Sequence, residues 1–431
     1  MYLIEYNYVC CVNIKKTTIV MTVNYLAFAI PAFFIFVYIE FKIAQQQKKT
    51  KIFKYESTVA NFSVGIAERL LNLFIAASFY QVYKWVYANY AIFDISTKWY
   101  IWILLLLATD FVWYWYHRLG HEINFLWAAH IVHHQSEEFN LSAAARITTI
   151  QAIFRNVFWC ALPLVGFHPN MIITILLAHG AYSFFTHTQL VGKLGWLENI
   201  FITPSLHGVH HASDEKYLDK NYGDVFVFWD KLFGTFQREE EAPKYGLTHP
   251  IKSYSFIWQH FHYYLEIGEA YRRADGFKAK WNAVFGSPAL MDQNIRPVLE
   301  ERYYQNKIQH EARPKPKFKI YLNLQLIMVV AMLTGTTMFY GSLTLVHKVA
   351  IAIFILVTLI NIGALLEQRR WIYYLECFRL ILIFGYFFYT FNIIELLIFP
   401  VVGLIILERN FSLNSLYKKH VLNYQSNTIN T

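Results

Sequence analysis

The sequence is poor in cysteine and lacks two common cofactor signatures. Only four of its 431 residues are cysteines: Cys160 and Cys377 lie in apolar runs, and Cys10 and Cys11 are adjacent near the start. This arrangement suggests neither a disulfide framework nor a cysteine-based zinc site. The chain also contains no G-x-G-x-x-G dinucleotide fingerprint and no cysteine motif for haem attachment. Any metal ligands must therefore be sought among other residue types.

Charge is also scarce, because only 16% of the residues are charged while 56% are hydrophobic and 19% aromatic. That composition is too apolar for an ordinary soluble protein of this length. The formal net charge is +9, but the lysines and arginines flank apolar runs instead of forming a basic domain, so we interpret them as topology signals and not as a nucleic-acid surface. The sequence predicts an all-α integral membrane protein, a multi-pass helical bundle.

Nine apolar runs approach the length that a bilayer core of about 30 Å requires. The predicted spans are 23–41, 64–88, 99–116, 147–167, 169–186, 320–340, 349–366, 371–389 and 393–407. Lysines concentrated in 42–54 mark the cytosolic side and an external N-terminus by the positive-inside rule. No small-residue cleavage site follows the first run, so we expect an uncleaved anchor, with either Met1 or Met21 as the start.

These spans predict five parts. They are a leader (1–22), an N-terminal transmembrane bundle (23–186), a catalytic cap at the cytosolic face (187–318), a C-terminal transmembrane bundle (319–408) and a cytosolic tail (409–431). Aromatic and basic residues alternate along the cap. This pattern fits helices that lie at the membrane interface, and it fits amphipathic core helices equally well. In the C-terminal bundle, Glu376 and Arg379 predict a local ion pair.

Eight of the seventeen histidines fall into three motifs. They are His117 and His121; His130, His133 and His134; and His207, His210 and His211. Residues three or four apart share one face of a helix, and neutral imidazole is the commonest nitrogen ligand of metals. The spacing therefore predicts a metal site where the third span ends at the cytosolic face. His187, at the cytosolic end of the fifth span, is added as a ninth ligand, and His179 is left open.

Nine imidazoles suit two metals that are each five- or six-coordinate. Zinc hydrolases generally include a carboxylate and use only three protein ligands, whereas histidine-only ligation favours a redox iron pair that activates dioxygen. The placement beside the membrane predicts oxidation of a lipid C–H bond. A metal transporter or sensor is the alternative from another class, although transport sites usually lie near the bilayer midplane among acidic residues.

Five carboxylates lie close to the motifs in sequence: Glu122, Glu137, Glu138, Asp214 and Asp230. Each is a candidate to hold an imidazole N–H group, as outer-shell carboxylates often do. Ordinary solvated charge is the alternative for each of them.

The order and spacing of these motifs resemble those of the fatty acid hydroxylase/sterol desaturase superfamily of membrane di-iron enzymes. Within this superfamily, the segment 99–255 is most similar to the tetrahydrobiopterin-dependent branch that cleaves the ether bond of alkylglycerols. The resemblance rests on WYHRLGHEINFLWAAHIVHHQSEEFNLSAAAR, on FFTHTQ and on the segment from TPSLHGVHH to YGLTHPI. The resemblance implies a di-iron site, O2 as a substrate, and Glu122 as a residue that acts with the pterin.

The implied reaction hydroxylates the alkyl carbon beside the ether oxygen, and the product collapses to a fatty aldehyde and a glycerol derivative. The electrons would come from the pterin or from a partner reductase, because the chain carries no other redox motif. The alternative within the superfamily is a fatty acid, sterol or sphingoid-base hydroxylase or desaturase that uses another reductant. The membrane would be the cell membrane in a bacterium and the endoplasmic reticulum in a eukaryote.

Overall fold

A computed structural model describes residues 13–14, 17–18, 23–304, 316–369 and 371–421. The chain divides into two compact units. The first unit holds Ala32–Lys252 and Gln259–Leu299; the second holds Ser253–Trp258 and the described parts of Ile4–Pro31 and Glu300–Thr431. The predicted leader with Met21 and the adjacent Cys10 and Cys11 lie outside the described residues.

The described chain is helical apart from one minimal hairpin, β1 (Asn13–Ile14) and β2 (Thr17–Thr18), which confirms the all-α prediction. Helices α1 to α12 supply the first unit, with α1, α10 and α12 running into residues of the second. They are α1 (Ala29–Gln46), α2 (Tyr55–Tyr90), α3 (Trp99–Glu122), α4 (Asn124–His130), α5 (Thr149–Trp159), α6 (Ala161–Val165), α7 (Pro169–Phe185), α8 (Pro204–His210), α9 (Phe228–Phe233), α10 (Phe256–Arg273), α11 (Gly276–Phe285) and α12 (Ile295–Tyr304).

Short 3-10 helices connect many of these elements. They are η1 (Tyr25–Phe28), η2 (Thr50–Ile52), η3 (His133–Gln135), η4 (Ala143–Ala145), η5 (Gly195–Asn199), η6 (Glu215–Tyr217), η7 (Pro288–Leu290) and η8 (Tyr340–Ser342). Two of them lie close to the histidine motifs in the chain. Helix η3 carries two histidines of the second motif, and η5 lies between the fifth predicted span and the last motif.

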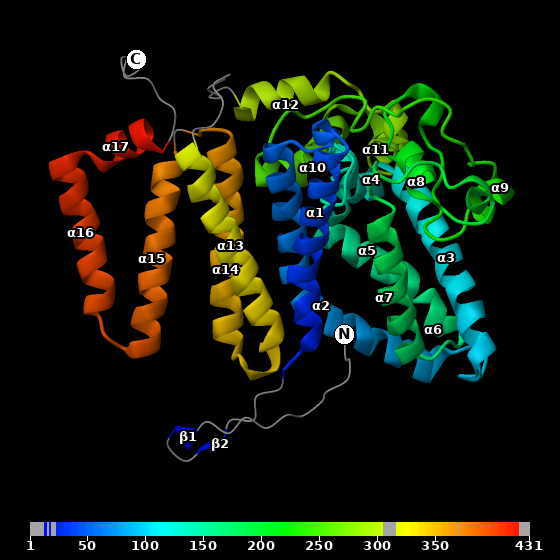
Figure 1. The fold of residues 1–431 in the computed structure, drawn as a ribbon, viewed down its shortest axis with the longest axis horizontal. Coiled ribbons are helices and arrows are strands. Elements are labelled where there is room, and N and C mark those ends of the chain that lie inside the picture. The colour runs from blue at the N-terminus through cyan, green and yellow to red at the C-terminus, as the bar shows by residue number, and fades with distance from the viewer. Residues whose placement is uncertain (1–12, 15–16, 19–22, 305–315, 370, 422–431) are drawn as a thin grey trace. The chain divides into compact units, whose positions relative to one another are not determined.

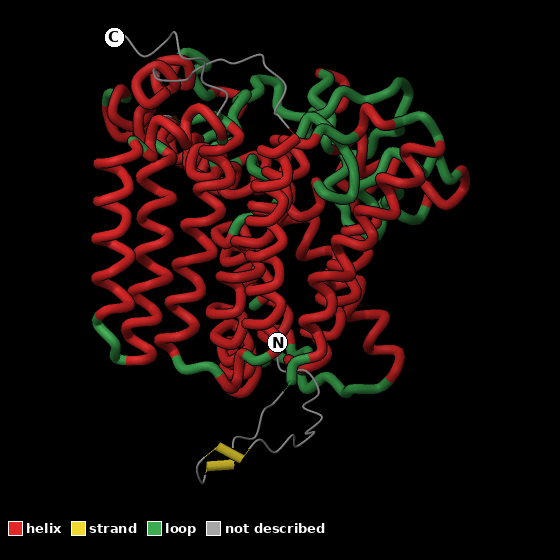
Figure 2. Tube along the Cα trace, turned by 60° about the vertical axis from the view of Figure 1, so that its left-hand side comes forward, coloured by secondary structure: helices red, strands yellow, loops and turns green. Residues whose placement is uncertain are grey.

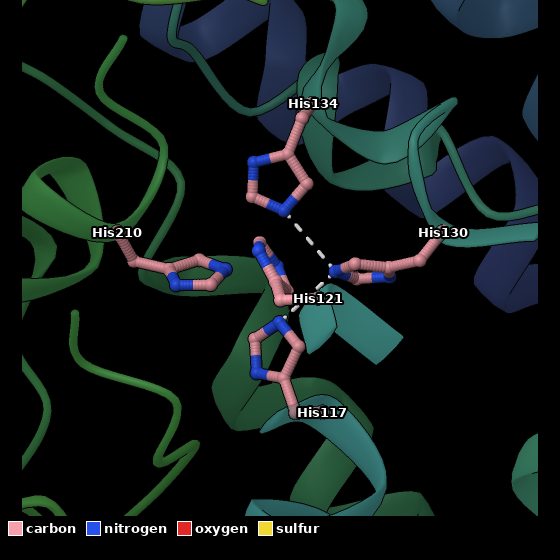
Figure 3. A group of neighbouring side chains, drawn as sticks. All are labelled: His117, His121, His130, His134 and His210. Atoms are coloured by element: carbon pink, nitrogen blue, oxygen red, sulfur yellow. Dashed lines mark hydrogen bonds between the residues drawn. The ribbon is translucent and has the colours of Figure 1, made fainter. Parts of the chain in front are cut away.

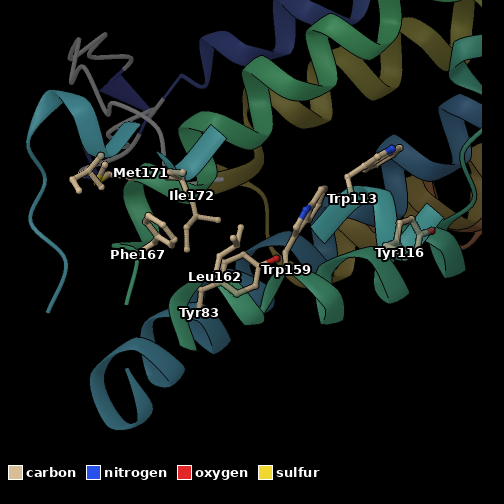
Figure 4. Close-up of a cluster of buried hydrophobic side chains, with 10 residues drawn as sticks. Tyr83, Trp113, Tyr116, Trp159, Leu162, Phe167, Met171 and Ile172 are labelled. Carbon is tan, nitrogen blue, oxygen red and sulfur yellow. The ribbon is translucent and has the colours of Figure 1, made fainter. Parts of the chain in front are cut away.

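Helix α3 packs against α5, α6 and α7 through a buried aromatic core (Figure 4). Trp113 and Tyr116 project from α3, Trp159 from α5 and Ile172 from α7, while the Tyr83 hydroxyl of α2 donates to the Asn156 Oδ1 atom at 2.7 Å. Large aromatic side chains bury much area with few rotatable bonds, so this core fixes the orientation of α3. The C-terminal turns of α3 carry His117 and His121.

The second unit contains a run of antiparallel neighbours, α13 (Pro316–Met338), α14 (Leu345–Leu366), α15 (Ile372–Phe391) and α16 (Glu395–Phe411), followed by α17 (Leu413–His420) (Figure 1). The predicted pair inside it is confirmed, because the Arg379 Nη1 atom lies 2.6 Å from the Glu376 Oε2 atom. Gln325 and Asn361 also hydrogen-bond Glu376. Such a network is the expected way to accommodate a carboxylate within an apolar bundle.

Among the described residues, five helices are long and apolar enough to cross a membrane, or six if the bent pair α16–α17 counts as one span (Figure 2). The five are Tyr25–Gln46, Tyr55–Tyr90, Phe318–Met338, Leu345–Leu366 and Ile372–Phe391. The protein is therefore an integral membrane protein. The nine-span count and the cytosolic placement of the site stay predictions.

Three predicted spans account for most of the difference. Helix α3 has the length of a span, but Asp110 and its many Trp and Tyr residues lower its mean hydropathy. The apolar stretches Thr149–Val165 and Pro169–Phe185 are helical as predicted, yet each measures only about 26 Å along its axis. That is short for a hydrocarbon core of about 30 Å.

Candidate metal centre

The nine predicted histidines converge into two groups in the first unit. The first group contains five, namely His117, His121, His130, His134 and His210; the second contains four, namely His133, His187, His207 and His211. Within each group, one nitrogen from every ring lies within 4.8 Å of the others. Figure 3 shows the five rings of the first group turned toward a common centre.

The two groups cut across the sequence motifs. His133 and His134 are neighbours in the chain but belong to different groups, and so do His210 and His211. Each H-x-x-H-H motif gives its residues i and i+4 to one group and its residue i+3 to the other, because consecutive side chains on a helical turn point about 100° apart. The two motifs are thus shared by both groups, so the groups lie side by side.

The spacing of the ring nitrogens fits a divalent metal in each group. In the first group, the His130 Nε2 atom lies 3.0 Å from the His117 Nε2 atom and 3.1 Å from that of His134. In the second, the His187 Nε2 atom lies 3.3 Å from that of His133 and 3.1 Å from that of His207. Two imidazole nitrogens bound at about 2.1 Å to one metal lie about 3.0 Å apart at right angles and about 3.4 Å apart at tetrahedral angles.

Hydrogen bonding alone does not account for this convergence. A ring nitrogen offers one proton or one lone pair, yet the Nε2 atoms of His130 and His187 each face two others. The Nε2 atoms of His121 and His210 are buried and have no hydrogen-bond partner in the described part of the chain. A cation at the centre of each group would bind these lone pairs, so the residues fit two metals.

The rings are held in the form that metals bind. Burial lowers the pKa of His133 and His207 well below the usual range, and neighbouring imidazoles lower it further. Burial also lowers the pKa of His187, to about 4. These rings are therefore neutral at pH 7, as a metal ligand requires.

Backbone carbonyls set the orientation of three rings. The Nδ1 atoms of His117, His210 and His187 lie 2.8, 2.9 and 2.8 Å from the carbonyl oxygens of Tyr222, Lys220 and Ser183. A carbonyl accepts only from an N–H group, so each ring carries its proton on Nδ1 and presents Nε2 to the group centre.

The segment 219–222 orients most of the first group. Besides the two carbonyls of Lys220 and Tyr222, its Asp219 Oδ1 atom lies 3.8 Å from the His121 Nδ1 atom. Asp219 and Asn221 both adopt left-handed backbone conformations, with φ of 58° and 54°. Strain of this kind persists only where surrounding contacts enforce it.

Two fully buried side chains enforce that conformation. The Asn221 Nδ2 atom donates to the carbonyls of Leu206 and Gln237, at 2.9 and 2.7 Å, and its Oδ1 atom accepts from the Gln237 N–H. Asp230 accepts from the Tyr222 N–H at 2.7 Å and from the Gly223 N–H at 2.9 Å. Burial raises the pKa of Asp230, these hydrogen bonds offset part of the increase, and the resulting pKa is about 6.

Buried Arg146 stabilises the segment that carries the second motif. Its Nε atom donates to the Val132 carbonyl at 2.7 Å, and its Nη atoms donate to the side-chain oxygens of Asn61, Gln135 and Gln259. Burial lowers the pKa of Arg146 to about 9, so the guanidinium stays charged at pH 7. Helix α2 begins well before the predicted span because its polar first turns supply Asn61 to this network.

The structure answers the open question about His179. This buried ring belongs to neither group; its Nε2 atom lies 3.1 Å from the Asp110 Oδ1 atom and its Nδ1 atom lies 2.7 Å from the Asp224 Oδ2 atom. Asp110 also accepts from the N–H groups of Val225 and Phe226. His179 therefore fastens the loop 224–226 to α3 and α7.

The structure places Glu122 beside the first group but outside it. Its Oε1 atom accepts from the Arg118 Nε atom at 2.8 Å, and 46% of its side chain is exposed. Exposed Asp219, which lies 3.8 Å from the His121 Nδ1 atom, is close enough to Glu122 for the two carboxylates to repel each other. The predicted role of Glu122 with a pterin stays a prediction.

The other four carboxylates have no hydrogen bond to an imidazole among the described residues. Asp230 acts on His117 only through the backbone of Tyr222, and Asp214 accepts from the Lys244 N–H at 2.7 Å. Glu137 is exposed, and Glu138 bonds Ser57. The groups that do hold the imidazoles are mainly backbone carbonyls, which no residue type reveals in a sequence.

Comparisons with known proteins agree with this geometry. The sequence profile of the fatty acid hydroxylase family matches residues 102–235, which include all nine histidines. The chain is 32% identical to human alkylglycerol monooxygenase over 80% of its own length and 78% of that protein, and 31% identical to the Danio rerio alkylglycerol monooxygenase over 77% and 76%. It is also 32% identical to the ornithine lipid hydroxylase of Rhizobium tropici over 31% of this chain and 41% of that protein.

No solved structure matches the fold. The relationship to the alkylglycerol monooxygenases nevertheless extends over about four fifths of the chain, well beyond the matched domain. The chain belongs to the fatty acid hydroxylase family and is related to the alkylglycerol monooxygenases within it.

Proposed function

We propose that the protein is a di-iron lipid monooxygenase that cleaves the ether bond of alkylglycerols at the cytosolic face of a membrane. The observation that carries the proposal is the convergence of nine neutral histidines into adjacent groups of five and four. The similarity to alkylglycerol monooxygenases over most of the chain supports this substrate class. The predicted nine spans and five-part division belong to the same proposal.

The five-histidine and four-histidine groups would each hold one iron. The bound iron pair would supply activation of dioxygen, and tetrahydrobiopterin would supply two electrons. One oxygen atom would enter the C–H bond beside the ether oxygen, and the other would leave as water with two protons. The resulting hemiacetal would collapse to a fatty aldehyde and a glycerol derivative.

The protein's own residues prepare the site for this chemistry. Burial keeps the imidazoles neutral and excludes bulk water from both groups, since eight of the nine rings are buried and His121 is nearly so. The carbonyls of Tyr222, Lys220 and Ser183 fix three rings before any metal binds. Such preorganisation reduces the rearrangement needed during reaction.

Glu122 would bind the pterin next to the five-histidine group. A carboxylate can accept two parallel N–H donors from a pterin ring, and Glu122 is partly exposed while its chain neighbour His121 belongs to that group. The Glu122→Gln variant should raise the KM for tetrahydrobiopterin about 10- to 100-fold, because hydrogen bonds to a charged group contribute about 1.5–3 kcal/mol. Metal content should be unchanged, and exposed Glu215→Gln serves as the control.

The direct test is aerobic turnover of a labelled alkylglycerol by the purified, iron-loaded protein. We expect release of fatty aldehyde with tetrahydrobiopterin and none without it. Absence of aldehyde from an iron-loaded protein would contradict the ether-cleaving proposal.

The second candidate is hydroxylation or desaturation of another lipid with a different reductant. The similarity to the ornithine lipid hydroxylase supports this second candidate, because that protein acts on a different lipid and yet resembles about a third of this chain. Turnover of acyl or sterol substrates with a reductase, without need for the pterin, would favour this candidate over the first.

A further inference from the structure

An apolar cavity of about 410 Å³ opens between the end of α7 and the segment before α8, and both of these lead along the chain to histidines of the four-histidine group. Its apolar wall is formed by Tyr182 and Phe185 from the end of α7, and by Leu194, Leu197, Phe201 and Ile202 from the segment that leads to α8. An engineered cavity of about 150 Å³ is enough to bind benzene, so this one has room for a considerable part of a long hydrocarbon chain.

The cavity runs from an exposed rim to a buried inner end. Phe185 and Leu194 at the rim are 49% and 40% exposed, whereas Ile202, Thr186 and Thr203 at the inner end are buried. The Tyr182 hydroxyl donates to the Ile202 carbonyl at 2.7 Å and joins the two walls. An exposed apolar rim on a membrane protein is suited to receive a chain from the lipid phase.

The inner end shares its backbone with two histidines of the four-histidine group. Thr186 immediately precedes His187, and the Thr203 carbonyl accepts from the His207 N–H at 2.9 Å. This group has one imidazole fewer than its neighbour, so a metal in it would keep an additional position open for reaction. The buried inner end of the cavity is therefore joined through the backbone to the group that has fewer imidazoles.

We propose that this cavity binds the saturated alkyl chain of the lipid substrate and directs the chain toward the four-histidine group. The inference rests on the proposed lipid monooxygenase function and adds the side from which the substrate approaches. Its lining presents few polar groups, which suits a hydrocarbon chain and not a lipid headgroup.

A bulky residue at the rim tests this assignment. The Leu194→Trp variant narrows the cavity, and Val191→Trp is the matched control, because Val191 is 42% exposed, lies three residues earlier and does not line the cavity. We expect Leu194→Trp to lower the ratio of kcat/KM for a hexadecyl substrate to that for an octyl substrate about tenfold, the effect of leaving about two methylene groups in water. An unchanged ratio in Leu194→Trp, or an equal fall in Val191→Trp, would overturn the proposal.

Photo-crosslinking separates this proposal from the proposed reaction. A hexadecylglycerol with a diazirine at the chain end should label peptides within 182–204 of the wild-type protein, and unlabelled hexadecylglycerol should suppress the labelling. Labelling there without turnover would support the cavity assignment while contradicting ether cleavage. Labelling confined to other segments would overturn the assignment, even in an active enzyme.

Discussion

Replacing Asn221 with alanine should remove the metal of the five-histidine group while leaving that of the four-histidine group. Among the described residues Asn221 forms no hydrogen bond with an imidazole, but it holds the segment whose Lys220 and Tyr222 carbonyls orient His210 and His117. None of the four imidazoles in the other group hydrogen-bonds this segment among the described residues. The two groups should therefore respond differently to one substitution.

The size of the effect follows from the contacts of Asn221. Alanine leaves three backbone groups without their partner, the buried carbonyl of Leu206 and the partly buried carbonyl and N–H of Gln237. The buried unpaired carbonyl costs about 1–3 kcal/mol, the two partly buried groups cost less, and the left-handed backbone costs alanine about 1 kcal/mol more. The backbone of 219–222 should relax to recover part of this energy, and this movement would displace the carbonyls of Lys220 and Tyr222 that orient the imidazoles. Loss of such outer contacts typically weakens metal binding about 10- to 100-fold.

Elemental analysis during chelator titration measures this effect. We expect one of two metals to leave Asn221→Ala at about 10- to 100-fold lower chelator concentration than in the wild type. Asn221→Gly, which tolerates the left-handed backbone, should be more stable than Asn221→Ala and show the same selective loss. Asn361→Ala, a fully buried asparagine of α14 in the second unit, is the matched control for lost stability with both metals retained. Equal chelator resistance of both metals in Asn221→Ala would refute the reasoning.

Two further predictions concern individual histidines. His133→Ala and His134→Ala should each retain at most one tightly bound metal and lose turnover. Because these neighbours belong to different groups, metal spectroscopy should show a different remaining site in each variant. Identical spectra of the remaining metal would contradict the division into two groups. His179→Gln should keep two metals but unfold at lower temperature, because the buried Asp110 and Asp224 would lose the imidazole that pairs with both of them, and leaving a buried charge without its partner costs about 3–5 kcal/mol. Loss of a metal with unchanged thermal stability would instead place His179 in the metal centre.

The spacing of the histidines was sufficient to find eight of the nine members of the two groups. Intervals of three and four residues place side chains on one helical face, and those faces do converge in the structure. The division into five and four could not be predicted, since it depends on which motifs face each other in space. His187, which belongs to no motif of its own, was found because it ends the fifth predicted span, and it joins the four-histidine group.

The groups that orient the imidazoles were mostly missed. Carboxylates near the motifs were the candidates, whereas the structure uses the carbonyls of Tyr222, Lys220 and Ser183. A carbonyl is present in every residue and leaves no signature in a sequence. The left-handed Asn221 was a weak signal, since asparagine tolerates that conformation better than most residues.

The helices were predicted better than their relation to the membrane. Apolar runs identified α3, α7 and the C-terminal helices, but run length alone does not show which of these helices cross the membrane. Tyrosine and tryptophan residues of α3 pack in the buried core around Trp113, and they lower the mean hydropathy of this helix. The same residue types are common at membrane interfaces and in protein cores, so the sequence alone does not distinguish the two locations.

We propose that these nine histidines hold two irons in unlike sites. Iron analysis combined with Mössbauer spectroscopy of the purified, iron-loaded protein tests this proposal most directly. We expect two irons per chain with two distinguishable environments, one with five and one with four imidazole ligands. A single iron per chain, or two irons retained after His133→Ala and His210→Ala substitution together, would contradict it.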